Sequence, residues 1–225
     1  LGNIAVVNFS DKTKIRDKKI FAQEILKKNP NIKTILEKSG KFSGRLRKMK
    51  TKHLAGEKNK EVLYKENNCV FRFNLDTTYF SPRLSNERKE IASLIKKADR
   101  VLVMFAGVGP YSICIAKNSG AEVFSNEINR EANKYAELNI KLNNVQDKVE
   151  LIPGDIKRVV EKLIGAKQKF SVIVMPRPRL KESFLKQAFL LSKKGTKIFY
   201  YDFCKIEDKN KIIEKIKNEA KKAKK

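Results

Sequence analysis

The chain has 225 residues, of which 41% are hydrophobic, so it can bury a full core and hold one medium domain together with a small one. Its 51 lysines and arginines exceed its 25 aspartates and glutamates, and the formal net charge of +26 favours a polyanionic partner such as nucleic acid, with an anionic membrane or a solvated thermophile-type surface as the alternatives. The chain has one histidine and three widely spaced cysteines, which are too few for a zinc site or a Ser-His-Asp triad. No apolar run approaches the roughly 20 residues that cross a bilayer, so a cytosolic protein is expected.

The first 80 residues predict a small α+β domain. A helix is expected to end near Lys28, with Ser10 or Asp11 as its cap. Asn67-Asn68 separates two apolar runs by two residues, which is a hairpin signal. The strands predicted in this domain cover residues 3–9, 32–37, 61–66 and 69–75.

A basic, glycine-containing passage separates the second and third of these strands. Its cations are Arg45, Arg47, Lys48, Lys50 and Lys52. They could contact nucleic-acid phosphates, or they could form a solvated edge in a chain that carries lysine throughout.

The second domain is expected to cover residues 81–225 and to alternate strands with helices. After a helix from Leu84 to about Ala98, the predicted strands are 100–105, 121–126, 148–152, 170–175 and 196–203. The predicted helices between and after them are 111–118, 129–142, 155–165, 182–193 and 207–222. This alternation predicts a Rossmann-like α/β domain, in which a parallel sheet is covered by helices on both faces.

An apolar strand, a glycine turn and an amphipathic helix follow one another at residues 104–113. Gly107 and Gly109 let the backbone approach a ligand closely, and the next helix begins there with unpaired N–H groups. Glu127 ends the next strand, about 20 residues later, where a carboxylate can bind ribose hydroxyls. Asp155 follows the third strand, although it could instead cap the helix that begins at Ile156. The spacing therefore predicts an adenosyl ligand across the carboxyl edge of the sheet.

Four segments in a fixed order resemble the archaeal and eukaryotic tRNA methyltransferases that modify guanine at position 37. These segments are His53–Glu57, Tyr64–Asn67, Tyr79–Arg88 and Met104–Pro110, and the likeness covers most of residues 1–203. The resemblance implies a class I S-adenosylmethionine-dependent fold preceded by an RNA-binding domain. The residues that it places at the cofactor are Tyr79, Phe105, Gly107, Gly109, Glu127, Asp155 and Pro176.

The resemblance also implies the chemistry of the target base. Glu87 would remove a proton from the base, while Arg83 and Arg47 would hold the base and its developing charge. Methyl transfer needs a lone pair aligned with the methyl donor, and an N–H must lose its proton to provide one. Glu87 could instead be a first-turn glutamate favoured by the helix dipole beside a Ser85 cap, and Tyr79 could be an ordinary core aromatic, as could Phe80.

Two positions depart from the family pattern. Pro176 stands where members that methylate guanine carry an asparagine that binds the base, and proline has neither a side-chain amide nor an N–H. Val103 stands where the family carries an acidic residue. The first change fits a branch of the family that methylates C7 of the tricyclic wyosine precursor. The expected substrate contacts come from Arg45, Lys48, Arg88, Arg177 and Arg179.

The expected partner is tRNA, through its anticodon stem-loop, bound by a monomer without a metal or a membrane. Two other classes stay open. The chain could be a non-catalytic RNA-binding module that retains the methyltransferase fold, which Val103 and Pro176 motivate. It could also be a nicotinamide-dependent oxidoreductase, against which Pro110 and Ser112 argue.

Overall fold

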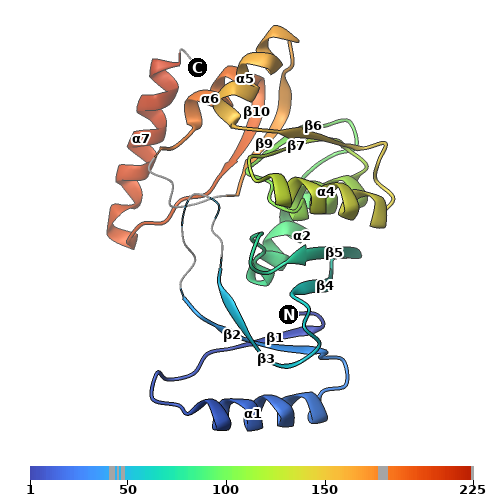
Figure 1. Cartoon of the computed structure of the whole chain (residues 1–225). Coiled ribbons are helices and arrows are strands. Elements are labelled where there is room, and N and C mark those ends of the chain that lie inside the picture. The colour runs from blue at the N-terminus through green and yellow to red at the C-terminus, as the bar shows by residue number, and fades with distance from the viewer. Residues whose placement is uncertain (41–43, 45, 47–48, 177–181, 224–225) are drawn as a thin grey trace.

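The computed structural model describes residues 1–40, 44, 46, 49–176 and 182–223 (Figure 1). At the N-terminus, three strands form a sheet in the order β1-β2-β3, with β1 parallel to β2 and β2 antiparallel to β3. One helix, α1, packs against this sheet on the side away from the rest of the molecule (Figure 1). These elements are β1 (Ile4–Val7), α1 (Ile15–Lys28), β2 (Thr34–Lys38) and β3 (Thr51–Gly56).

Two local predictions for this region were wrong. Lys14 occupies the N-cap of α1 without a side-chain bond, because the preceding residues form a turn in which the Thr13 N–H donates to the Ser10 carbonyl at 3.0 Å. Neither Ser10 nor Asp11 therefore caps the helix. Strand β3 was not predicted, because its side chains do not alternate strictly between buried and exposed positions.

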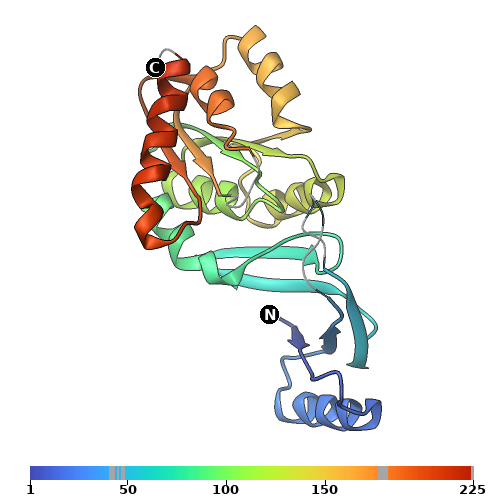
Figure 2. The ribbon, with the colours of Figure 1, turned by 90° about the vertical axis from the view of Figure 1, so that its left-hand side faces the viewer.

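The hairpin prediction is confirmed by strands β4 (Glu61–Glu66) and β5 (Cys69–Asn74), which pair antiparallel. Asn67 and Asn68 both have positive φ, 47° and 61°, as a two-residue type I′ turn requires. The hairpin lies between the N-terminal unit and the larger domain (Figure 2). Its inward side chains belong to the core of the larger domain, and they are Cys69, Phe71 and Phe73.

The larger domain contains five strands in the order β10-β9-β6-β7-β8, all parallel, as predicted. Alternate residues of the central strand point to opposite faces: Val101 and Val103 join one core, and Leu102 and Met104 join the other. Both faces of the sheet are therefore buried. The strands are β6 (Arg100–Met104), β7 (Glu122–Glu127), β8 (Val149–Pro153), β9 (Phe170–Met175) and β10 (Ser192–Tyr200).

Helices cover both faces of this sheet. One core contains buried residues of α2, α3 and α4 together with the hairpin, and the other contains those of α5 and α6, with α7 packed outside them. The helices and short 3-10 turns are η1 (Pro82–Leu84), α2 (Ser85–Ser93), α3 (Pro110–Ser119), α4 (Arg130–Leu142), α5 (Ile156–Gly165), α6 (Leu185–Leu191), η2 (Ile206–Asp208) and α7 (Lys209–Lys222). Within the described part of the chain, no helix has the length and hydrophobicity to cross a membrane.

The boundary between α6 and β10 differs from the sequence expectation. The helix ends at Leu191 and the strand begins at Ser192, four residues earlier than predicted. The pairing of β10 with β9 shifts register between Ser192 and Lys197, and Gly195 in this interval has a φ of 84°. Such an irregular strand start lacks the period-2 signal on which the prediction relied.

Candidate active site

The carboxyl edge of the large sheet opens at the central strand. β6 lies between β7 and β9, so the order in which the strands are added to the sheet reverses at β6. Ligands of open α/β sheets bind at such a switch point. The loop after β6 has three residues with positive φ: Phe105 at 60°, Gly107 at 60° and Gly109 at 87°. Only glycine adopts this conformation without strain, so Phe105 is held there by its surroundings.

Glu127 fixes this loop to the end of β7. Its Oε2 accepts the Gly107 N–H at 2.8 Å, and its Oε1 accepts the N–H groups of Ile128 and Asn129 at 2.8 and 2.7 Å. The Ala106 N–H donates to the Asn126 carbonyl at 2.8 Å. The structure thus brings together Gly107 and Glu127, two residues that the sequence predicted at one ligand.

Asp155 lies at the next strand end, in a 480 Å³ pocket between the ends of β7 and β8. Its Oδ1 accepts the Lys157 N–H at 3.0 Å, so it caps α5, as the alternative prediction proposed. The Asn126 side chain donates to the carbonyls of Ile152 and Gly154 at 2.8 and 3.1 Å, so it connects the ends of β7 and β8 beside the pocket. The cations that line this pocket are Arg130, Arg158 and Lys162.

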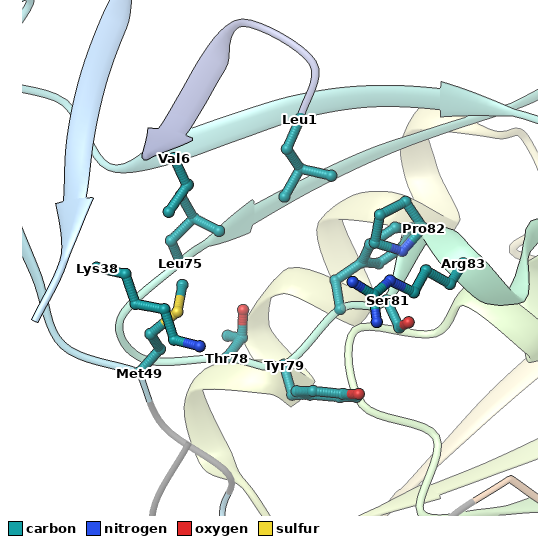
Figure 3. Close-up of a pocket in the computed structure, with 11 residues that line it drawn as sticks. Leu1, Val6, Lys38, Met49, Leu75, Thr78, Tyr79, Ser81, Pro82 and Arg83 are labelled. Atoms are coloured by element: carbon teal, nitrogen blue, oxygen red, sulfur yellow. The ribbon is translucent and has the colours of Figure 1, made fainter. Parts of the chain in front are cut away.

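A second pocket, of 510 Å³, lies between the N-terminal unit and the larger domain (Figure 3). Lys38 enters it from β2 and Arg83 from η1, on opposite sides (Figure 3). Tyr79 joins this pocket to the glycine loop, because a Cβ built on Gly107 would meet the Tyr79 carbonyl oxygen at 3.5 Å. Phe80 stacks on Phe73 at 4.6 Å and is a core aromatic.

Glu87 lies in the first turn of α2 and is half-buried. Its carboxylate accepts a hydrogen bond from the hydroxyl of Tyr201, a residue just after β10 that the sequence prediction missed. Burial, followed by this bond to Glu87, raises the pKa of Tyr201. Ser85 makes no capping bond, because its Oγ and carbonyl accept the side-chain amide of Asn67 instead.

Arg88 does not occupy a substrate-binding position, and this prediction is corrected. Its side chain is 1% exposed and pairs with Glu66, whose side chain is 3% exposed, through Nε to Oε1 and through a 2.7 Å bond to Oε2. It also donates to the Ser81 carbonyl at 3.0 Å. Burial and these partners give Arg88 a structural role between α2 and the hairpin.

Of the other predicted site residues, Pro176 lies at the edge of the site, and the rest lie outside the residues that the structure describes. Pro176 follows β9, and the pairing of Val103 with Val174 brings it level with Phe105. Val103 itself is fully buried in the centre of the sheet. The predicted base and phosphate contacts that lie outside the described residues are Arg45, Arg47, Lys48, Arg177 and Arg179.

Comparison with known proteins identifies the family of this chain. Residues 62–225 match the TRM5/TYW2 methyltransferase domain, and residues 1–59 match the TYW2 N-terminal domain. The chain belongs to the TRM5/TYW2 methyltransferase family. The family resemblance stated from the sequence is therefore confirmed.

Curated TRM5/TYW2 relatives include tRNA methyltransferases. The tRNA (guanine(37)-N(1))-methyltransferase of Dictyostelium discoideum is 37% identical over 185 residues, which are 82% of this chain and 40% of the relative. The tRNA (guanine(37)-N(1))/4-demethylwyosine(37)-methyltransferase Taw22 of Nanoarchaeum equitans is 36% identical over 217 residues, 96% of this chain and 70% of the relative. The chain spans between 30% and 70% of the length of the curated relatives that it is compared with.

Solved TRM5/TYW2 structures have the same fold. The crystal structure of Trm5b from Pyrococcus abyssi matches 98% of this chain and 64% of its own, with a TM-score of 0.83 and 34% identity. A complex of aTrm5 with tRNALeu matches 95% of this chain and 62% of its own, with a TM-score of 0.83 and 29% identity. The predicted fold class is confirmed.

Proposed function

We propose that this chain is a methyltransferase that uses S-adenosylmethionine to modify the purine next to the anticodon of tRNA, at position 37, and that it acts as a monomer on the anticodon stem-loop. The observation that carries the proposal is the bond between the Glu127 carboxylate and the Gly107 N–H at the carboxyl edge of the sheet. Relatives named for guanine-37 methylation support the substrate.

The residues at this edge fit an adenosyl cofactor. Glu127 would bind the ribose hydroxyls, and Asp155 would contact the adenine end through its pocket. Gly107 has a φ of 60°, which residues with a side chain rarely adopt, so glycine suits this turn beside the Tyr79 carbonyl. When bound, S-adenosylmethionine would supply an electrophilic methyl group on a sulfonium.

The target base would enter through the pocket that Arg83, Lys38 and Tyr79 line. We assign Glu87 as the base that accepts a proton from the purine nitrogen, which leaves a lone pair to attack the methyl carbon. Arg83 would stabilise negative charge as it develops on the purine. Arg47 keeps the role that the family resemblance implies, as a second cation at the base.

The finer substrate assignment is guanine N1, C7 of 4-demethylwyosine, or both in turn. The Nanoarchaeum equitans relative is named for both bases. Pro176 lies level with Phe105 at the carboxyl edge and provides no side-chain amide for a base edge. A base contact that differs from the usual one is consistent with a second, tricyclic substrate.

The test is transfer of a tritiated methyl group to two tRNAs, one with unmodified guanine at position 37 and one with 4-demethylwyosine there. Label on either tRNA supports the proposal and assigns the base. Glu87→Gln should lower the rate by at least roughly 100-fold, because general-base catalysis contributes that much or more. S-adenosylmethionine binding should persist in this variant.

Glu90→Gln is the matched control, because Glu90 is an exposed glutamate on the same helix. Wild-type rates in both variants would remove Glu87 from the proposed role. Label on neither tRNA, together with no cofactor-induced rise in melting temperature, would overturn the proposal in favour of a non-catalytic RNA-binding module.

A further inference from the structure

We infer that Tyr201 positions the Glu87 carboxylate. The inference rests on the proposed function, because it concerns the residue assigned there as the base. Tyr201 and Glu87 are separated by 114 positions, and the fold brings the end of the last sheet strand to the first turn of α2. The tyrosine hydroxyl donates directly to Glu87 Oε1.

Tyr201 is itself held by the helix that follows the glycine loop. Its ring meets that of Tyr111 edge to face, with centroids 6.3 Å apart and planes inclined at 66°. Tyr111 is 3% exposed and lies in the first turn of α3, two residues after Gly109. This ring contact therefore connects Tyr201, which donates to Glu87, to the helix α3 that follows the proposed cofactor loop.

Burial keeps Tyr201 as a donor. Burial raises the pKa of Tyr111 to about 12, and burial also raises the pKa of Tyr201 above the ordinary tyrosine value. Further charged groups near this pair are Arg88, whose guanidinium lies 5.7 Å from the centre of the Tyr111 ring, and its partner Glu66. Because its pKa is raised, the Tyr201 hydroxyl stays protonated across the physiological pH range.

The hydrogen bond from the Tyr201 hydroxyl orients the Glu87 side chain. It restricts the rotations of a flexible side chain, which fixes the direction from which the second carboxylate oxygen meets a base. Tyr201 acts through Glu87 and is a positioning residue.

Tyr201→Phe tests this role, because it removes the hydroxyl and keeps the ring against Tyr111. Loss of a hydrogen bond to a charged group predicts a roughly 10- to 100-fold fall in the single-turnover methyl-transfer rate. The KM for tRNA and the Kd for S-adenosylmethionine should stay at wild-type values.

Tyr200→Phe is the matched control. Tyr200 precedes Tyr201 and donates to Asp202 at 3.0 Å, so the variant removes a neighbouring hydroxyl from outside the site. Its rate should equal that of the wild type. If Tyr201→Phe keeps the wild-type rate, or changes only the melting temperature, the positioning role is wrong while the proposed function stands.

A second readout is independent of methyl transfer. In protein labelled with ¹³C at the glutamate carboxyls, the Glu87 resonance, assigned by its absence from Glu87→Gln, should have a different chemical shift in Tyr201→Phe, because the carboxylate loses the hydrogen bond from the tyrosine. An unchanged Glu87 chemical shift would overturn the inference. This measurement decides the inference even if the wild type transfers no methyl group, a result that would count against the proposed function alone.

Discussion

At the scale of single residues, two glutamates of the resembling segments have different surroundings. Glu66 is buried against Arg88, and Glu87 is half-buried beside Tyr201. The Arg88 guanidinium also lies 5.0 Å from the centre of the Phe80 ring. A buried charge so enclosed depends on its partner, because water cannot replace it.

Glu66→Gln should lower the free energy of unfolding by about 3–5 kcal/mol, since it leaves the Arg88 charge buried without a counter-charge. Glu122→Gln is the control: the side chains of Arg100 and Glu122 are 33% and 53% exposed, and such a pair contributes less than about 1 kcal/mol. Urea unfolding at neutral pH measures both. Equal losses in the two variants would contradict a structural role for the Arg88 pair.

At the scale of elements, two asparagines, one in α4 and one at its C-cap, bind the edge of the hairpin. Asn139 accepts the Arg72 N–H at 2.7 Å and donates to the Arg72 carbonyl at 3.0 Å. Asn143 does the same for Val70, at 2.9 and 2.7 Å. Four residues of helix rise about 6 Å and two residues of strand about 6.6 Å, so the two repeats match. The side-chain amides take the place of a neighbouring strand.

This contact also reaches the glycine loop, because Asn139 donates to the Val108 carbonyl at 3.0 Å. The hairpin is thus joined to the large domain by hydrogen bonds and by a shared core. We propose that the boundary between the domains lies near residue 60 and not at residue 80, in agreement with the ranges matched by the two family domains.

Asn143→Ala should destabilise the fold by roughly 2–4 kcal/mol, because it leaves a backbone N–H and carbonyl of Val70 without side-chain partners. Hydrogen exchange of the Val70 amide should accelerate in the variant. Asn86→Ala is the control, since Asn86 is exposed on α2. An unchanged Val70 exchange rate would show that the amide does not hold the hairpin.

At the scale of the whole molecule, the net charge of +26 acts on any polyanion that approaches. We expect tRNA affinity to fall about 100-fold between about 50 and 200 mM salt, as roughly four phosphate contacts would require. S-adenosylmethionine affinity, which involves few charges, should hardly change over that range. Filter binding and calorimetry measure the two responses, and a flat tRNA response would contradict a phosphate-dominated interface.

Much of the architecture follows from local features of the sequence. Apolar periodicity predicted the alternation of strands and helices, the pair Asn67-Asn68 predicted the hairpin turn, and Gly107 with Glu127 predicted the centre of the candidate site. These signals work because side-chain periodicity and backbone preference depend on neighbouring residues.

Only the tertiary structure decided which polar groups meet. Sequence analysis predicts Arg88 as a substrate contact and assigns no role to Tyr201, Asn139 or Asn143. The fold instead pairs Arg88 with Glu66 and Tyr201 with Glu87. Local periodicity does not indicate which residues tens of positions apart in the sequence will be in contact. The role of a charged side chain depends on whether packing buries it with a counter-charge or leaves it at a pocket.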